Sequence, residues 1–216
     1  MENSVGHSFS YRGHLPELST EHEVQLQRFR EIVLDWNSRI NLISRKDTET
    51  FEIRHVLHSL SIIRYIRFWT GARVLDLGTG GGFPGIPLAI VNPEVQFTLV
   101  DSIEKKMKAV ADMVAQLGLG NVRVVRSRVE DIKSPVDYVV SRAVAPMPEL
   151  VRWTREIVLP GQAGSLPNGW LVLKGGDLKE ELRPFGKSAE VQPLQAYWED
   201  DFFETKSLVY VPRQQV

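Results

Sequence analysis

VLDLGTGGGFPGIPLAI, residues 74–90, places five glycines and two prolines directly behind a short apolar run. Gly78, Gly80 and Gly82 can adopt positive φ angles and let backbone N–H groups approach a ligand with no Cβ in the way. A tight turn on its own would need only one or two glycines. The stretch therefore predicts a buried strand that runs into a ligand-binding loop and then a helix.

Beyond Gly71, short apolar segments alternate with helical ones, which is typical of a parallel sheet covered by helices. We expect strands at 73–77, 95–101, 121–127, 136–143 and 169–175, with helices near 85–91, 103–117, 147–158 and 177–183. Segments 191–199 and 205–212 are expected to pair as an antiparallel hairpin on the sheet edge. The pattern predicts a doubly wound, Rossmann-like α/β sheet with an antiparallel C-terminal strand.

The region before Gly71 has helical periodicity instead. Apolar residues spaced by three and four predict helices over 20–36 and about 48–68. Thr20 and Glu23 fit a capping box for the first helix, and Asp47 fits the N-cap of the second. We therefore expect a helical extension over residues 1–70 and a Rossmann-like domain over residues 71–216.

Composition excludes several classes of protein. The chain has 216 residues, 43% of them hydrophobic and 25% charged, and it contains no apolar run long enough for a membrane helix. The polar N-terminus does not resemble a secretory signal, so we expect a cytoplasmic protein. The absence of cysteine excludes disulfides, thiolate metal sites and cysteine nucleophiles.

The net charge of −1 gives no overall attraction to nucleic acid, so an RNA partner would need a local basic face. Candidate cations are concentrated between positions 105 and 128, where acidic neighbours dilute them: Lys105, Lys106, Lys108, Arg123, Arg126 and Arg128. The residues alone therefore leave RNA binding open.

The identity of the ligand is a finer question. GGGFPG, residues 80–85, matches the GxGxxG pattern of dinucleotide-binding loops, so a dinucleotide-dependent oxidoreductase is one alternative. Two features favour S-adenosylmethionine. Asp76, at the end of the strand, suits the ammonium group of a methionine moiety. Pro84 and Pro87 also stand where a pyrophosphate-binding helix would present N–H groups, and proline has none.

Three later strand ends supply further candidates for this cofactor. Asp101 ends the second strand, where its carboxylate can accept hydrogen bonds from a ribose diol. Val129 and Glu130 follow the third strand and could frame an adenine ring and its amino group. Arg142, after the fourth strand, would face either the cofactor carboxylate or the substrate.

These residues resemble the glucose-inhibited division protein B family, also called ribosomal RNA small-subunit methyltransferase G. Besides DLGTGGGFPGIPLAI, the family's motifs occur in order in WNSRINLIS (36–44), RHVLHS (54–59), SRVE (127–130), SRA (141–143) and LKG (173–175). One departure is His58, which stands where the family commonly has Asp in a HxxDS segment that begins at His55. The resemblance covers nearly the whole chain.

The resemblance implies an enzyme that uses S-adenosylmethionine to methylate N7 of one guanine in 16S ribosomal RNA, as naked RNA or within the small subunit. Carried over by position, the cofactor contacts are Gly78, Phe83, Val129, Glu130 and Arg142; the reading of the residues adds Asp76, Gly80 and Asp101. A methyltransferase acting on a small molecule or a protein is the other alternative. We expect a monomer.

Guanine N7 has an in-plane lone pair and loses no proton on methylation, so no catalytic base is expected; Arg142 is the one candidate for a substrate contact. Trp36 and Trp153 lie at helical spacing with apolar residues and are expected in the core. His55 and His58 are expected to be structural, and no metal site is expected because no cluster of ligands completes one.

Overall fold

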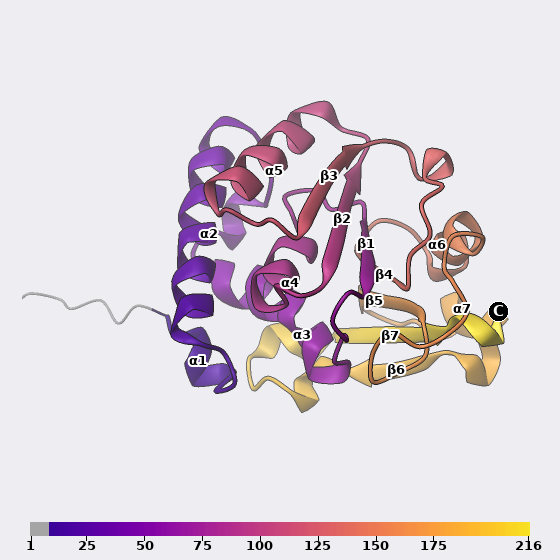
Figure 1. The fold of residues 1–216 in the computed structure, drawn as a ribbon. Helices are drawn as coiled ribbons and strands as arrows, with labels where there is room; N and C mark the ends of the chain where they lie inside the picture. Colours follow the sequence, from indigo (N-terminus) through magenta and orange to yellow (C-terminus); the bar gives the residue numbers. More distant parts are fainter. Residues whose placement is uncertain (1–8) are drawn as a thin grey trace, which may run out of the picture.

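The computed structural model describes residues 9–216, which form one seven-stranded sheet with helices on both faces (Figure 1). The strand order is β3-β2-β1-β4-β5-β7-β6. The first five strands pair in parallel, and β7 runs antiparallel to both of its neighbours. The strand bounds are β1 Arg73–Leu77, β2 Gln96–Asp101, β3 Val122–Arg126, β4 Tyr138–Arg142, β5 Gly169–Gly175, β6 Glu190–Pro193 and β7 Lys206–Pro212.

Helices cover the two faces of the sheet in two groups. One face carries α3 (His58–Tyr65), α4 (Gly85–Val91) and α5 (Glu104–Gln116), and α2 (Thr20–Arg39) packs against α4 and α5 from outside. The other face carries α6 (Met147–Thr154) and α7 (Lys179–Leu182). The remaining helical turns are α1 Tyr11–His14, η1 Arg45–Asp47, η2 Glu52–Leu57, η3 Val129–Asp131, η4 Arg183–Ser188, η5 Leu194–Ala196, η6 Asp201–Phe203 and η7 Arg213–Gln215.

Strand β1 shows why this sheet must be covered on both faces. Val74 packs into the core beneath α3, α4 and α5, whereas Leu75 and Leu77 pack into the core beneath α6 and α7. Since successive side chains of a strand point to opposite faces, a strand whose apolar residues point to both faces must be buried on both. The predicted doubly wound α/β sheet with an antiparallel C-terminal strand is confirmed, and the expected strands differ from the observed bounds by at most two residues, the shorter β6 excepted.

Helix α2 begins at Thr20, as predicted, but its capping box lies one residue before the predicted one. The box is formed by Ser19, whose hydroxyl accepts from the His22 N–H at 3.1 Å while the Ser19 N–H donates to the His22 ring. The predicted box of Thr20 and Glu23 is wrong. Glu23 instead accepts hydrogen bonds from the backbone N–H groups of Tyr11 and Arg12, and so ties α1 to α2.

The second predicted helix is divided into a π-helical segment, η2, and the α-helix α3. Asp47 does not cap it. Its carboxylate pairs with Arg54 at 2.7 Å and lies 3.6 Å from the His55 ring. Arg54, seven residues further along the chain, thus binds the carboxylate that the sequence predicts to accept hydrogen bonds from the helix backbone.

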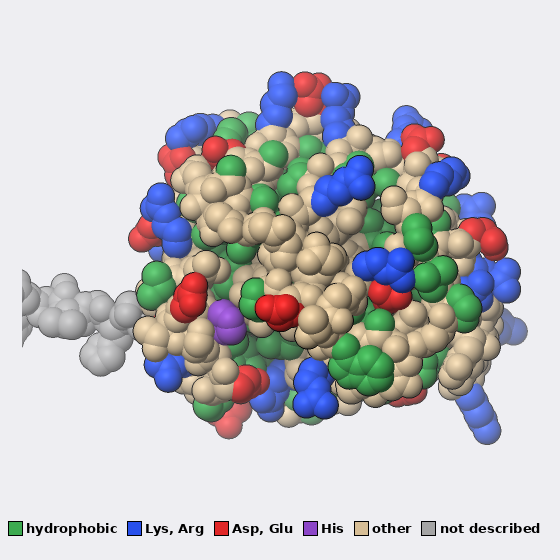
Figure 2. Space-filling view, viewed as in Figure 1, with side chains coloured by type: hydrophobic (Ala, Val, Ile, Leu, Met, Phe, Trp, Pro, Cys, Tyr) green, Lys and Arg blue, Asp and Glu red, His purple; other side chains and the backbone are tan. Residues whose placement is uncertain are grey.

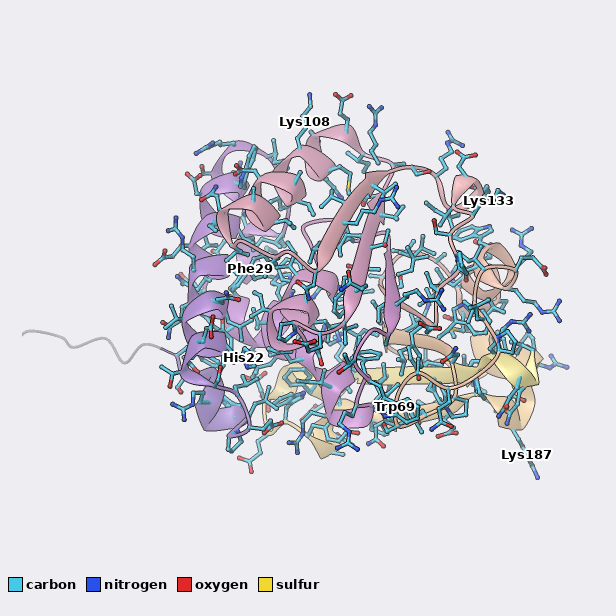
Figure 3. The ribbon with its side chains drawn as sticks, in the orientation of Figure 1. His22, Phe29, Trp69, Lys108, Lys133 and Lys187 are labelled. Carbon is cyan, nitrogen blue, oxygen red and sulfur yellow. The ribbon has the colours of Figure 1, made fainter. Side chains whose placement is uncertain are left out.

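The helices before Gly71 share a core with the sheet. Phe29 of α2 is fully buried against the rings of Phe51 and of Phe83 from the glycine loop (Figure 3). The boundary between a 1–70 extension and a 71–216 domain stays a prediction. Within residues 9–216, no helix is long and apolar enough to cross a membrane.

Candidate active site

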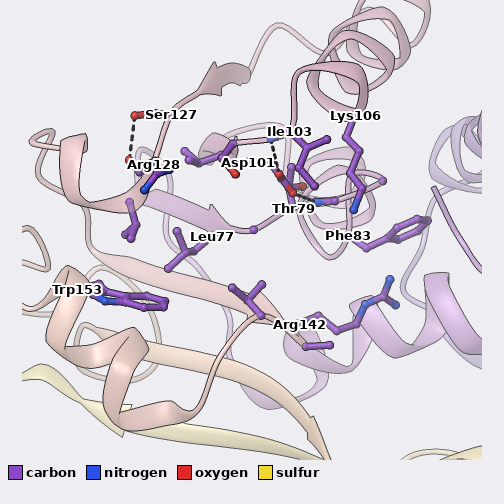
Figure 4. A pocket seen from close by; sticks show the side chains of 18 of the residues that line it. Leu77, Thr79, Phe83, Asp101, Ile103, Lys106, Ser127, Arg128, Arg142 and Trp153 are labelled. Carbon is purple, nitrogen blue, oxygen red and sulfur yellow. Dashed lines mark hydrogen bonds between the residues drawn. The ribbon is translucent and has the colours of Figure 1, made fainter. Parts of the chain in front are cut away.

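A cavity of about 700 Å³ opens at the carboxyl ends of β1, β2 and β4 (Figure 4). At this point the chain changes from adding strands on one side of β1 to adding them on the other side. Open α/β sheets bind their ligands at this kind of position. We call it the glycine-loop cavity. Its lining residues are Leu42, Leu77, Gly78, Thr79, Gly80, Gly81, Phe83, Val100, Asp101, Ser102, Ile103, Lys106, Ser127, Arg128, Val129, Glu130, Arg142, Ala143, Val144 and Trp153.

The glycine loop needs its glycines for conformation and for space. Gly78 and Gly80 have φ values of 70° and 57°, in the left-handed region. A Cβ atom at Gly78 would overlap Val144 of the loop after β4, so the two loops can approach each other only because Gly78 has no side chain. The loop predicted from the sequence therefore does form one wall of a cavity.

Asp76 lies beneath this loop and is fully buried, and it does not line the cavity. Its Oδ2 accepts hydrogen bonds from the Thr79 hydroxyl at 2.6 Å and the Gly85 N–H at 2.8 Å. Burial raises the pKa of this carboxyl to about 7. Asp76 is placed to shape the loop and the start of α4, in contrast to the direct contact with a ligand ammonium that the sequence analysis expects.

The N-terminus of α4 has little capacity to bind a pyrophosphate. The Gly85 N–H donates to Asp76, the Ile86 N–H donates to the Gly82 carbonyl, and Pro87 has no N–H. A dinucleotide-binding helix needs free N–H groups at this point. The GxGxxG match thus lacks the feature that would make it a dinucleotide site.

Asp101, Val129 and Glu130 all line the glycine-loop cavity, as their positions at strand ends predict. Asp101 Oδ2 accepts from the Gly80 N–H at 3.1 Å and Oδ1 accepts from the Ile103 N–H at 2.9 Å. These bonds fix the carboxylate at the cavity wall, and a carboxylate with two acceptor sites on each oxygen still has capacity for a ligand hydroxyl.

Arg142 lies where the glycine-loop cavity meets a second one. The residue is half-buried, and burial lowers the pKa of its guanidinium to about 10. Nη1 donates to the Arg54 carbonyl at 3.2 Å, and the group stacks over the Phe83 ring at 4.8 Å. Ala143, the next residue, has a φ of 55°, an unusual value for a residue with a side chain and one that is often found at functional sites.

His55 holds the other side of this guanidinium. Arg142 Nη2 lies 3.1 Å from Nδ1 of His55, and because arginine can only donate, Nδ1 is the acceptor and Nε2 carries the proton toward Asp47. Burial and the nearby Arg142 lower the pKa of His55 to about 3, so the ring stays neutral. His55 is buried, as expected, yet it also orients a cavity residue, which the sequence analysis did not foresee.

The second cavity, of about 630 Å³, shares Arg142, Ala143 and Val144 with the first. We call it the Phe202 cavity. Its other lining residues come from η1, η2, α3, the loop after β4, the end of β5, α7, η6 and the start of β7: Asp47, Arg54, His55, His58, Ala145, Pro146, Leu173, Lys174, Gly175, Glu181, Phe202 and Lys206. A ligand in either cavity would thus contact the loop after β4.

Two residues of the glycine-loop cavity have another role in the predictions from the sequence, where Trp153 is a core residue and Lys106 is a candidate cation for RNA. Trp153 of α6 is half-buried and lies at the cavity wall on the far side from Phe83 (Figure 4), although its spacing predicts a core position. Lys106 lies in the first turn of α5, directly after the strand that ends in Asp101. The sequence could have predicted that Lys106 lies near the cavity, because it follows the end of a strand. The position of Trp153 could not be predicted in this way, because it depends on how α6 packs.

Two of the six basic residues between 105 and 128 pair with an acidic neighbour. Glu104 pairs with both Lys108 and Arg126, at 2.9 and 3.1 Å. Figure 2 shows basic and acidic side chains interspersed over the face it presents. Within residues 9–216, no group of three or more potential metal ligands is found.

Comparison with known proteins identifies the family. The model of GidB, rRNA small subunit methyltransferase G, matches residues 22–204. A protein of Bacteroides fragilis named ribosomal RNA small subunit methyltransferase G is 47% identical over 198 residues, which cover 92% of this chain and 96% of that protein. The chain belongs to the rRNA small subunit methyltransferase G family.

Solved structures agree on the fold of this family member. An S-adenosylmethionine-dependent O-methyltransferase from Thermotoga maritima superposes with a TM-score of 0.58 at 15% identity, covering 85% of this chain and 71% of that one. An S-adenosylmethionine-dependent methyltransferase from Aquifex aeolicus gives 0.54 at 17% identity, covering 78% and 98%. The sheet therefore has the same fold as these two methyltransferases.

Proposed function

We propose that this protein transfers a methyl group from S-adenosylmethionine to N7 of one guanine in 16S ribosomal RNA. The observation that carries the proposal is the glycine-loop cavity at the switch point of the sheet, in a chain that matches a ribosomal RNA methyltransferase family over most of its length. An enzyme with this substrate would act in the cytoplasm, and we propose that it acts as a monomer.

The cavity fits the proposed cofactor in size and in chemistry. Its volume of about 700 Å³ lies in the range of small-molecule sites. The Cβ position of Gly80 is open, with only the Gly78 carbonyl within 4 Å, so the loop leaves the space that a ligand needs. Asp101 would accept from the ribose, Val129 and Glu130 would frame the adenine, and Arg142 would face either the cofactor carboxylate or the substrate.

When bound, S-adenosylmethionine supplies an electrophilic methyl group. The N7 lone pair can attack that group directly, so the chain's residues need only hold the two partners in line; such positioning can contribute about 7–11 kcal/mol. Two of the five N–H donors of Arg142 are used by Arg54 and His55. One of the others could donate to guanine O6, whereas a second bond to N7 would block the attacking atom.

Methyl transfer to RNA tests this proposal directly. The purified protein is given methyl-labelled S-adenosylmethionine with naked 16S rRNA or with 30S subunits, and the RNA is digested to nucleosides. We expect label in 7-methylguanosine. Label found only in protein or in a small molecule would refute the proposal, and thermal stabilisation by NAD but not by S-adenosylhomocysteine would favour the oxidoreductase alternative.

A further inference from the structure

Among the residues that line the Phe202 cavity, the cations outnumber the carboxylates. Of its four cations, Arg54 pairs with Asp47 at 2.7 Å and Lys174 pairs with Glu181 at 2.8 Å. Within residues 9–216, Arg142 and Lys206 have no carboxylate within 4 Å. The chain as a whole has a net charge of −1, so this excess is local and favours an anionic ligand.

Phe202 gives the cavity an aromatic side chain that has two cations close to its ring. Arg54 lies 5.6 Å and Lys206 5.0 Å from the centre of its ring, which is half-buried. Aromatic rings flanked by cations are the groups that bind unstacked nucleotides, because the ring stacks on the base and the cations contact the phosphate.

His58 adds a buried nitrogen without a partner. The residue is only 5% exposed, and no hydrogen bond reaches its Nε2 within the described residues. Burial, Arg142 and Lys206 lower the pKa of this ring, so it stays neutral and can exchange a single hydrogen bond with a base. A buried polar atom with no partner is costly, and a ligand in this cavity is one way to satisfy it.

The Phe202 cavity is adjacent to the proposed cofactor site. Arg142, Ala143 and Val144 line both cavities, so a base in the Phe202 cavity would lie beside the loop that also borders the cofactor. The volume of about 630 Å³ leaves room for one nucleotide.

We propose that the Phe202 cavity receives the guanine nucleotide that is methylated, with its base against Phe202 and its phosphate at Lys206. The inference rests on the proposed function, because it names the acceptor site for the same reaction. Neither residue lines the glycine-loop cavity, so both can be altered without touching the proposed cofactor contacts.

Two substitutions test the proposal, Lys206→Gln and Phe202→Leu. We expect each to raise KM for the RNA about tenfold or more while the Kd for S-adenosylhomocysteine, measured by calorimetry, stays unchanged. Lys206→Gln should also lower the slope of log affinity against log salt by about one, as for the loss of one phosphate contact. Lys206→Arg should restore both values.

Lys187→Gln and Phe185→Leu are the matched controls. Lys187 is an exposed lysine at the edge of the molecule (Figure 3), and Phe185 is a half-buried phenylalanine packed against α6 and α7. Both should leave KM unchanged. Wild-type KM and salt slope in the two test variants would overturn the inference, and so would an equal loss of S-adenosylhomocysteine binding. A wild-type protein that does not methylate 16S rRNA would instead refute the proposed function.

Discussion

Arg142 donates a hydrogen bond to Nδ1 of His55 over 3.1 Å at the point where the two cavities of the protein meet. The bond fixes a guanidinium that borders the proposed cofactor site and the proposed acceptor site together. Asp47, near the other nitrogen of His55, helps to keep the ring in the tautomer that accepts this bond. His55 and Asp47 are therefore positioning residues for Arg142.

The first prediction concerns this contact. His55→Leu removes the acceptor and should lower kcat for methyl transfer about 10- to 100-fold, since hydrogen bonds to charged groups contribute about 1.5–3 kcal/mol. His55→Gln keeps an acceptor atom and should recover much of the rate. Steady-state kinetics with separate kcat and KM values make the comparison.

Ser61→Ala is the control for stability alone. Ser61 is buried in α3 and accepts a hydrogen bond from Trp198 at 2.8 Å, away from both cavities. It should lower the melting temperature and leave kcat unchanged. If His55→Leu behaved in the same way, the positioning role of His55 would be refuted.

The second prediction concerns Asp76 and pH. The folded pKa of about 7 lies above the ordinary value of 3.8, so the folded state binds more protons between these values and stability falls as pH rises from about 4 to about 7. Asp76→Asn cannot titrate. We expect the variant to gain up to about 4 kcal/mol relative to the wild type over this window.

Denaturant unfolding at several pH values measures this difference. Comparing the two proteins at each pH cancels the contributions of the other titrating groups, including the two buried histidines. A difference in unfolding free energy that stays constant from pH 4 to pH 8 would show that the Asp76 carboxyl titrates normally.

The third prediction concerns Asp101. Its carboxylate holds the glycine loop through the Gly80 N–H and is proposed to accept from the ribose, so Asp101→Ala should weaken S-adenosylhomocysteine binding about tenfold or more. Asp35→Ala changes an exposed carboxylate of α2 outside the cavity and should bind normally. Calorimetry measures the affinity of both variants for S-adenosylhomocysteine. Equal affinities would exclude Asp101 from the cofactor site.

The fourth prediction uses Trp153 as a probe. Of the five tryptophans, only Trp153 lines the glycine-loop cavity in the described part of the chain. Binding of S-adenosylhomocysteine should therefore change tryptophan fluorescence, and Trp153→Phe should abolish the change while calorimetry still detects binding. A full signal in the variant would mean that the ligand binds elsewhere.

The parallel sheet, the antiparallel C-terminal strand and the glycine loop could be predicted from the amino-acid sequence. These follow from local rules: strands such as β1 are apolar on both faces, and a loop with Gly78 and Gly80 needs positive φ angles. Strand ends also predicted that Asp101, Val129, Glu130 and Arg142 would meet, since the carboxyl ends of parallel strands lie at one edge.

The contacts of the other polar residues depend on how the chain folds. The neighbours of Asp47 and Asp76 in the sequence do not indicate their contacts. In the folded protein, Asp47 lies against Arg54 and His55, and Asp76 is buried beneath the glycine loop. The Phe202 cavity unites residues from positions 47 to 206. Contacts between segments so far apart depend on how helices and loops pack on the finished sheet, and no local pattern encodes them.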